Sequence, residues 1–303
     1  MRVPPSQKAY CLLQCQYGME LGGIFLFEVN YNHVLDLTPE ARAQYVQANE
    51  AIFKQMLQNI GDESAILRDQ QNYRLFIQLL SENAIPQHVL HQFVEYLASD
   101  KGLLFQIGAK NGNSIFQRSF SALFLTAIVN ADRQLQILSQ QEIDHIAEKG
   151  IALFKNEQDL RSYVNEDAGW AHAIPNAADL LCAIIQHPNY PIRMTAQILQ
   201  AIRANLWKDY VYTDDEEERF CMIVESILNK GIDEALLIEW FEQLYEQLEM
   251  IAYERGYQAF WFKARTNLLN VSKTLYFHLK FSNRHDQLRG IVSMFIQRWL
   301  KMS

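Results

Sequence analysis

Apolar residues recur at helical spacing through most of this sequence, and this periodicity constrains the fold more than any other feature. From about residue 38 onward they follow one another three or four positions apart, as on one face of an α-helix. In the segment 237–251 six of them share one stripe: Leu237, Trp240, Phe241, Leu244, Leu248 and Ile251. The pattern predicts an all-α chain with more than half of its residues in helices.

The breaks between these periodic stretches are marked by glycine and proline, and they divide the chain into short helices. We expect helices at about 39–58, 65–82, 86–99, 114–130, 139–157, 173–187, 192–207, 215–230, 233–253, 256–280 and 285–300. Strand patterns are scarce, and the best candidates are 23–27 and 103–105. Neither has a partner at hairpin distance, so we expect no sheet of three or more strands.

The spacing of the helices indicates how they are arranged. Short connections imply antiparallel neighbours, and helix pairs recur every 40–50 residues or so, which favours an α-solenoid of HEAT-like or armadillo-like pairs. A compact all-α bundle is the alternative. We expect one helical-repeat domain at 38–303, preceded by an N-terminal extension or cap at 1–37.

The segment 116–129 is apolar nearly all round, which is typical of a helix that is covered on most sides. We expect five of its side chains to be buried: Phe116, Phe120, Leu123, Phe124 and Ala127. Arg118, Ser119 and Ser121 interrupt the apolar surface, and each needs a polar partner if it is buried.

Charge and composition exclude some classes of partner. Lysine and arginine number 27 against 35 acids, a net charge of −8, so there is no broad basic surface for nucleic acid. Nowhere do 18 apolar residues follow one another, and no signal-peptide pattern is present, so we expect no membrane partner. The four cysteines (Cys11, Cys15, Cys182 and Cys221) match no zinc or disulfide pattern. Reduced thiols fit a cytoplasmic location.

Three motifs in the middle of the chain carry a family resemblance. They are Phe-x-Arg-Ser-Phe-Ser at 116–121, EQDLRSYV at 157–164 and GWAHAIPNAADLL at 169–181. Their order and spacing resemble a bacterial family, the domain of unknown function 2785 family. GDESAILRD at 61–69 and NLLNVSKTLYF at 267–277 extend the resemblance to roughly 55–280. It implies an all-helical array of HEAT-like or armadillo-like type and supplies no activity.

The third motif departs from the pattern of the family it resembles. That pattern reads Gly-Trp-Ala-His-Ala-x-Ala-His-x-Ala-Asp, and here Pro175 and Asn176 stand where alanine and the second histidine are usual. In the family form, two histidines and an aspartate at i, i+4 and i+7 resemble metal-ligand spacing on one helix face. Asn176 is a weak neutral ligand, and Pro175 favours a helix that begins after His172. We therefore expect neither a metal nor a cofactor.

Six residues in these motifs are the candidates for a site: Arg118, Asp159, Arg161, Trp170, His172 and Asp179. One interpretation is a structural lock, a set of contacts that fixes the loop after helix 139–157 against the core. Trp170 would then be buried, and Asp179 would accept hydrogen bonds from Arg161 or Arg118. The other is a pocket for an anion or small ligand. The lock requires side chains that interlock, and the pocket requires that they converge on an open cavity.

Two functions remain open from the sequence. The first is a non-catalytic helical-repeat protein that binds a protein or peptide along a concave surface, or acts as a scaffold. The alternative is a small-ligand-binding protein or enzyme with a pocket around GWAHAIPNAAD. No residue is assigned a catalytic role, because the motif serines lack the Gly-x-Ser-x-Gly context of a nucleophile.

Overall fold

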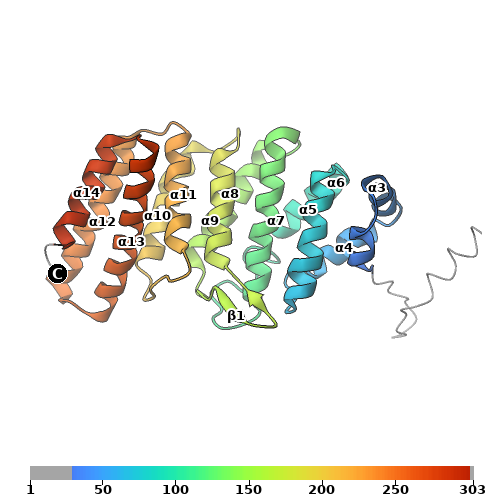
Figure 1. The fold of residues 1–303 in the computed structure, drawn as a ribbon, viewed down its shortest axis with the longest axis horizontal. Coiled ribbons are helices and arrows are strands. Elements are labelled where there is room, and N and C mark those ends of the chain that lie inside the picture. The colour runs from blue at the N-terminus through green and yellow to red at the C-terminus, as the bar shows by residue number, and fades with distance from the viewer. Residues whose placement is uncertain (1–28, 301–303) are drawn as a thin grey trace, which may run out of the picture.

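A computed structural model provides the structure of the chain and describes residues 29–300. The helices of this part stand side by side in a row that follows the order of the sequence (Figure 1). A two-stranded hairpin, made by β1 (Tyr163–Asn165) and β2 (Gly169–Trp170), is the one sheet of the described residues. The prediction of an all-α chain is confirmed.

The first part of the row contains short helices. They are α2 (Tyr31–Leu35), α3 (Pro39–Ala48), α4 (Ala51–Gln58), the π-helix η1 (Ile66–Tyr73), α5 (Arg74–Ser81) and α6 (Gln87–Leu97). Thr38 caps α3, and Pro39 occupies its first turn, as the sequence indicates. The single helix predicted at 39–58 is wrong in one respect: it is two helices, α3 and α4, because the helix is interrupted at 49–50. The helix α2 lies before residue 38 and packs against α3, α5 and η1.

Longer helices follow. They are α7 (Ser114–Leu135), α8 (Gln140–Asn156), α9 (Ala173–Gln186), the 3₁₀ turn η2 (Ile192–Met194), α10 (Thr195–Leu206), α11 (Glu216–Asn229), α12 (Glu234–Arg255), α13 (Ala259–Ser282) and α14 (Asp286–Leu300). Most lie within three residues of the predicted bounds, and α7 runs five residues further than expected. A capping box starts α8, where the Ser139 side chain accepts from Glu142 N and the Glu142 side chain from Ser139 N.

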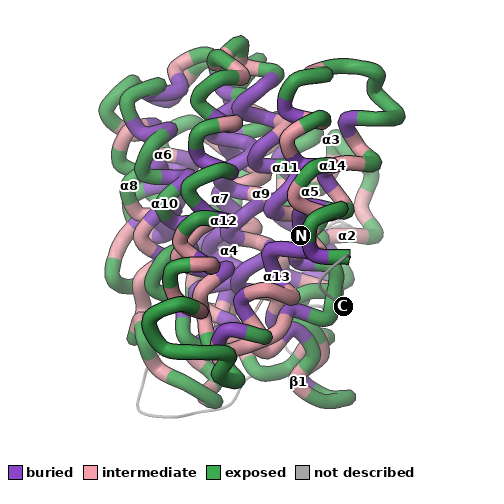
Figure 2. The backbone as a smooth tube through the Cα atoms, turned by 90° about the vertical axis from the view of Figure 1, so that its left-hand side faces the viewer, coloured by how far each residue is buried: buried purple, intermediate pink, exposed green. Residues whose placement is uncertain are grey.

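Helices two places apart in the sequence contact each other along the row. α7 packs on α9, α9 on α11, and α11 on α13, while α8 contacts both α9 and α10. At the C-terminal end, α12, α13 and α14 pack on one another. Seen along the row, the buried positions lie in the interior and the exposed positions lie on the outer surfaces and loops (Figure 2).

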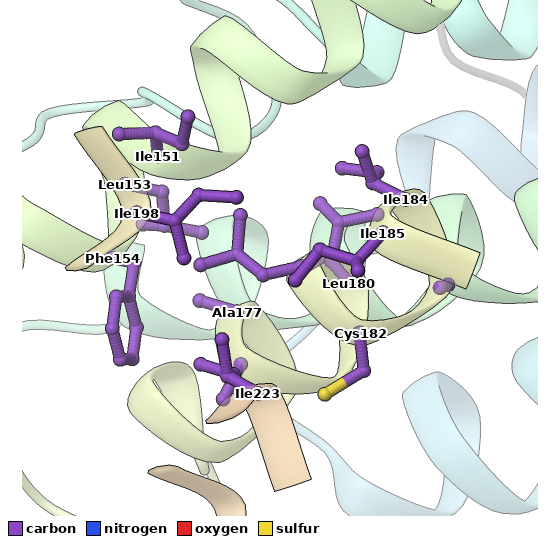
Figure 3. Close-up of a cluster of buried hydrophobic side chains, with 14 of the residues drawn as sticks. Ile151, Leu153, Phe154, Ala177, Leu180, Cys182, Ile184, Ile185, Ile198 and Ile223 are labelled. Atoms are coloured by element: carbon purple, nitrogen blue, oxygen red, sulfur yellow. The ribbon is translucent and has the colours of Figure 1, made fainter. Parts of the chain in front are cut away.

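The core is centred on α9, whose side chains meet those of α8, α10 and α11. Figure 3 labels Ile151, Leu153, Phe154, Ala177, Leu180, Cys182, Ile184, Ile185, Ile198 and Ile223, all of them buried. Close approach of α8 to α9 depends on Gly150, because a Cβ there would lie 3.3 Å from Leu180 Cδ2. Apolar packing of this kind is the main source of stability in such an array.

The burial of α7 agrees with the sequence at three positions and differs at two. Phe116, Phe120 and Phe124 are buried, as predicted. Leu123 and Ala127 are only half-buried, because they lie on the side of α7 that the neighbouring helices leave open.

The strand predictions were wrong within the described residues. Segment 103–105 forms turns, and the real hairpin at 163–170 was not foreseen; the other candidate, 23–27, lies outside the described residues. Cys182 and Cys221 are buried free thiols, and Cys11 and Cys15 lie outside the described part. Among the described helices, none combines the length and the apolar character that crossing a membrane requires.

Candidate functional site

The six candidate residues lie at one edge of the row, around the loop that joins α8 to α9. This loop, residues 157–172, contains the hairpin and lies below α7 and α9 in Figure 1. Arg118 is on α7, and Asp179 is on the second turn of α9. The other four are in the loop itself: Asp159, Arg161, Trp170 and His172.

Arg118 fixes the start of the loop. Its Nε donates to Glu157 Oε2 at 2.6 Å and one terminal nitrogen donates to Glu157 Oε1 at 2.8 Å, with both side chains fully buried. The other terminal nitrogen donates to Phe105 O and Ser114 Oγ, each at 3.0 Å. Every nitrogen of this buried guanidinium therefore has a partner, which offsets the cost of removing the charge from water.

Glu157 in turn organises the backbone that follows it. Its Oε1 accepts from the amides of Gln158 and Asp159, each at 2.9 Å. Its carbonyl oxygen accepts from Lys208 Nζ at 2.7 Å. Burial lowers the pKa of Lys208 to about 8, against the opposing effect of Glu157. These contacts join the end of α8 to α7 and to the turn after α10.

Arg161 pairs within the loop. Its Nε and one terminal nitrogen donate to the two oxygens of Asp159 at 2.8 and 2.6 Å, and that terminal nitrogen also reaches Gly112 O. Hydrogen bonding to Asp159 raises the pKa of Arg161. The pair therefore bends the loop on itself and ties it to the turn before α7.

Asp179 has a different partner from the ones expected. Arg219 on α11 approaches it at 3.3 Å, so the expectation of Arg161 or Arg118 is wrong. Those two arginines already have the nearer carboxylates of Asp159 and Glu157, whereas α11 lies directly beside α9. Burial raises the pKa of Asp179, although Arg219 acts in the opposite direction.

The end of the loop is joined to α7 and α11. Ser119 donates to Ala171 O, and Asn176 Nδ2 donates to Ser119 Oγ at 2.8 Å. Ser162 Oγ donates to the buried carboxylate of Glu216, the first residue of α11, at 2.7 Å. Ser119 thus has a structural partner on each side.

A further arginine, on η1, holds the hairpin. The terminal nitrogens of Arg68 donate to Ala168 O at 2.6 Å and to Asp62 O at 2.7 Å. Its guanidinium lies over the rings of Phe116 and Phe120, 4.0 and 4.6 Å from their centres. Burial lowers the pKa of Arg68. The hairpin is therefore packed between η1 and the first turns of α7.

Trp170 is exposed, contrary to expectation. Half of its surface (49%) is open to solvent, as is Tyr163 opposite it on β1 (48%). The two rings meet edge to face at 5.1 Å, and Trp170 contacts the ring of His172 at 4.5 Å. Ala168, Ala171 and Phe116 pack together beneath the hairpin. The indole of Trp170 therefore lies outside this small apolar cluster.

His172 precedes α9, where its φ of 52° is unusual for a residue other than glycine. Pro175 fits the first turn of α9 because amides there need no partner within the helix. His172 Nε2 is buried and has no hydrogen-bond partner. Burial lowers the pKa of His172, against the opposing effect of Glu216 and Asp214.

The six candidate residues line neither of the two best-defined hollows in the described part of the chain. One of these hollows, of about 180 Å³, lies at the end of α5 and the start of α6 and is lined by Leu80, Asn83, Ile85, Gln87, Leu90, Leu135 and Ile137. The other lies between α11 and α13 and is negligible in volume. Nor do the described residues contain three or more His, Cys, Asp or Glu side chains placed to hold a metal ion.

Several residues of this site were missed from the sequence. Glu157 and Arg68 lie within quoted motifs, EQDLRSYV and GDESAILRD, but neither was singled out. Glu216 and Arg219 lie at the start of α11, outside the three central motifs. An unpaired arginine in one motif and an unassigned glutamate in the next were the available clue to the Arg118–Glu157 pair.

These features define a class: an all-helical array with a hairpin loop that is fixed along its edge by buried polar contacts. The family described as protein of unknown function (DUF2785) matches residues 103–277, and the chain belongs to this family. The match contains the three central motifs, whereas segment 61–69 lies outside it. No curated protein and no solved structure matches the chain.

Proposed function

We propose that the chain is an α-solenoid of HEAT-like or armadillo-like helix pairs that binds a protein or peptide partner and has no catalytic role. One observation carries the proposal. The charged residues of the motifs are engaged in internal contacts, whereas the two rings that these contacts position, Tyr163 and Trp170, are half exposed. A rigid hairpin that presents aromatic rings is suited to partner recognition.

The open face of the row continues from these rings. His172 is followed by Asn176 and Asp179 on one side of α9. Arg219 on α11 approaches Asp179, and the same terminal nitrogen donates to Met222 Sδ at 3.6 Å. On α7, which packs on α9, Leu123 and Ala127 are half-buried. We infer that the partner lies along this side of α9 and α11, as partners do on the binding surface of helical-repeat proteins.

Site-specific photo-cross-linking tests this function. A photoreactive residue replaces Tyr163 in the full chain, and the control places it at Ile192, which is exposed at the other end of α9. We expect a defined cross-linked protein at position 163 that is absent at 192 and is lost when Trp170→Leu is added. Equal products at both positions, or a product that survives Trp170→Leu, would contradict the proposal.

A small-ligand-binding function is the second candidate, and His172 favours it. A buried imidazole nitrogen without a partner, on a residue with a strained backbone, is the kind of group that ligands contact. Native mass spectrometry of the purified protein tests this alternative. A stoichiometric small molecule that His172→Asn removes would support it, and a bare polypeptide mass would count against it.

A further inference from the structure

The rings of Tyr163 and Trp170 project from an unusually acidic part of the molecule. Three segments meet there: the start of η1 at 61–69, the loop at 157–172 and the start of α11 at 214–219. Together they carry twelve acidic residues against three arginines.

Hydrogen bonds place both acidic helix starts against the hairpin. The amide of Ala65 donates to Asp167 O at 3.1 Å, and Arg68 donates to Ala168 O, so η1 lies on one side. Ser162 donates to Glu216 at 2.7 Å, so α11 begins on the other. The hairpin therefore lies between two acidic segments.

The nearby cations neutralise only part of this set. Arg118 pairs with Glu157, and Arg161 pairs with Asp159. Arg219 pairs with Asp179 on α9, and Arg68 is buried against backbone carbonyls. In the described part of the chain, salt bridges are lacking for Glu63, Glu166, Asp167, Asp215, Glu217 and Glu218. Glu217 follows Asp215 and Glu216 and precedes Glu218, and burial together with these neighbouring carboxylates raises its pKa.

This combination has a specific chemical preference. An exposed indole attracts a guanidinium or ammonium group over its face, and tryptophan does so best among the aromatic residues. Surrounding carboxylates attract the same cation and repel anions. We propose that the hairpin binds an arginine- or lysine-bearing segment of a protein partner, with one cationic side chain over Trp170. This inference rests on the proposed function and names the chemistry of the partner.

Peptide binding tests the inference directly. The probe is a short fluorescein-labelled peptide of alternating arginine and glycine, measured by fluorescence anisotropy on the full chain at physiological salt. Its controls are peptides with glutamine or glutamate in place of arginine. We expect only the arginine peptide to bind. We expect Trp170→Leu to lower its affinity about two- to fivefold, the usual range for an exposed cation–π contact.

Matched variants show whether peptide binding depends on the hairpin or on the overall negative charge of the protein. Phe281→Leu removes a ring that is exposed on α13, and Glu239→Gln with Glu242→Gln removes two charges from α12. We expect both to bind as the wild type does, whereas Glu166→Gln with Asp167→Asn weakens binding. Thermal melts monitored by circular dichroism establish that each variant is folded.

The outcomes distinguish this inference from the proposed function. If Trp170→Leu binds the arginine peptide as the wild type does, or if the α12 variant loses as much affinity as the hairpin variant, the inference is wrong. It is also wrong if the glutamate peptide binds equally. If cross-linking through position 163 still depends on Trp170 in those cases, the proposed function stands with a partner of different chemistry. If that dependence is absent as well, both fail.

Discussion

Arg118 and Glu157 form a buried, bidentate ion pair whose charges are both satisfied, and such a pair is costly to break on one side. We expect Glu157→Gln to lower the free energy of unfolding by about 3–5 kcal/mol, because it leaves the Arg118 charge underpaired in the core. Urea denaturation measures the change.

The exposed pair of Arg193 and Asp144 provides the control for this prediction. Arg193→Met removes an ion pair whose arginine is largely solvated, so we expect a loss below about 1 kcal/mol. Similar losses for the two variants would show that the Arg118–Glu157 pair is not fixed as the structure indicates.

His172 gives the protein a pH dependence with a definite sign. Its folded-state pKa lies below the ordinary value of 6.5, so the unfolded chain binds a proton more readily. The stability from this residue is complete above about pH 6.5 and is lost as the pH falls below it. We expect His172→Asn to reduce the fall in unfolding free energy between pH 7 and pH 5, because asparagine tolerates positive φ and does not titrate there.

Leu123→Ala serves as the comparison, since it removes no titratable group and should leave the slope of the pH profile unchanged. Denaturation with urea across this pH range, on wild type and both variants, gives the profiles. An unchanged slope in His172→Asn would mean that burial of this imidazole does not oppose its protonation.

At this scale the sequence indicated that the charged motif residues need partners, but it did not indicate which partners they have. Charged motif residues require partners when buried, and this follows from solvation alone. Which carboxylate faces which arginine depends on the path of the loop, which carries no periodic signal. For that reason Glu157 and Arg219 were missed as the partners of Arg118 and Asp179.

Among the elements, the hairpin depends on Gly169 for its position. Gly169 has a φ of 66°, and a Cβ there would lie 3.2 Å from Ala65 Cβ on η1. Gly169→Ala therefore adds backbone strain and pushes the hairpin away from η1. We expect it to lower the unfolding midpoint more than Gly231→Ala, where φ is 84° and the space is open. Equal midpoint shifts would show that the close approach to η1 contributes nothing.

The helix α7 supports the same hairpin from within. Phe120 is buried and lies under the Arg68 guanidinium, so we expect Phe120→Ala to cost about 3–5 kcal/mol of unfolding free energy. Leu123→Ala on the half-open side of α7 should cost clearly less. Urea denaturation compares the two, and a loss below about 1 kcal/mol for Phe120→Ala would place this part of α7 at the periphery.

Helices could be predicted from sequence because their apolar spacing is local and repeated, and their bounds follow from caps and glycines. The hairpin could not, since its strands of two and three residues are too short for an alternating pattern to emerge. The π-helix at Ile66–Tyr73 shares the apolar stripe of an α-helix and likewise gives no separate signal.

In the molecule as a whole, each helix mainly contacts its neighbours in the row. We therefore expect a destabilising substitution at one end to affect only the nearby helices. Trp299 on α14 packs against Tyr245 of α12 with ring centres 4.7 Å apart. We expect Trp299→Ala to speed amide hydrogen exchange in α12–α14 and to leave α7 and α9 unchanged. Hydrogen-exchange mass spectrometry resolves these segments. A uniform increase along the chain would favour the compact bundle over the solenoid.

The loop 157–172 also has a mechanical consequence. It contacts η1 through Asp167 and Ala168, α7 through Ala171, and α11 through Ser162. Because it joins these three helices along one edge of the row, we expect it to resist relative movement between η1, α7 and α11. A partner bound at the hairpin would therefore contact a restrained part of the molecule.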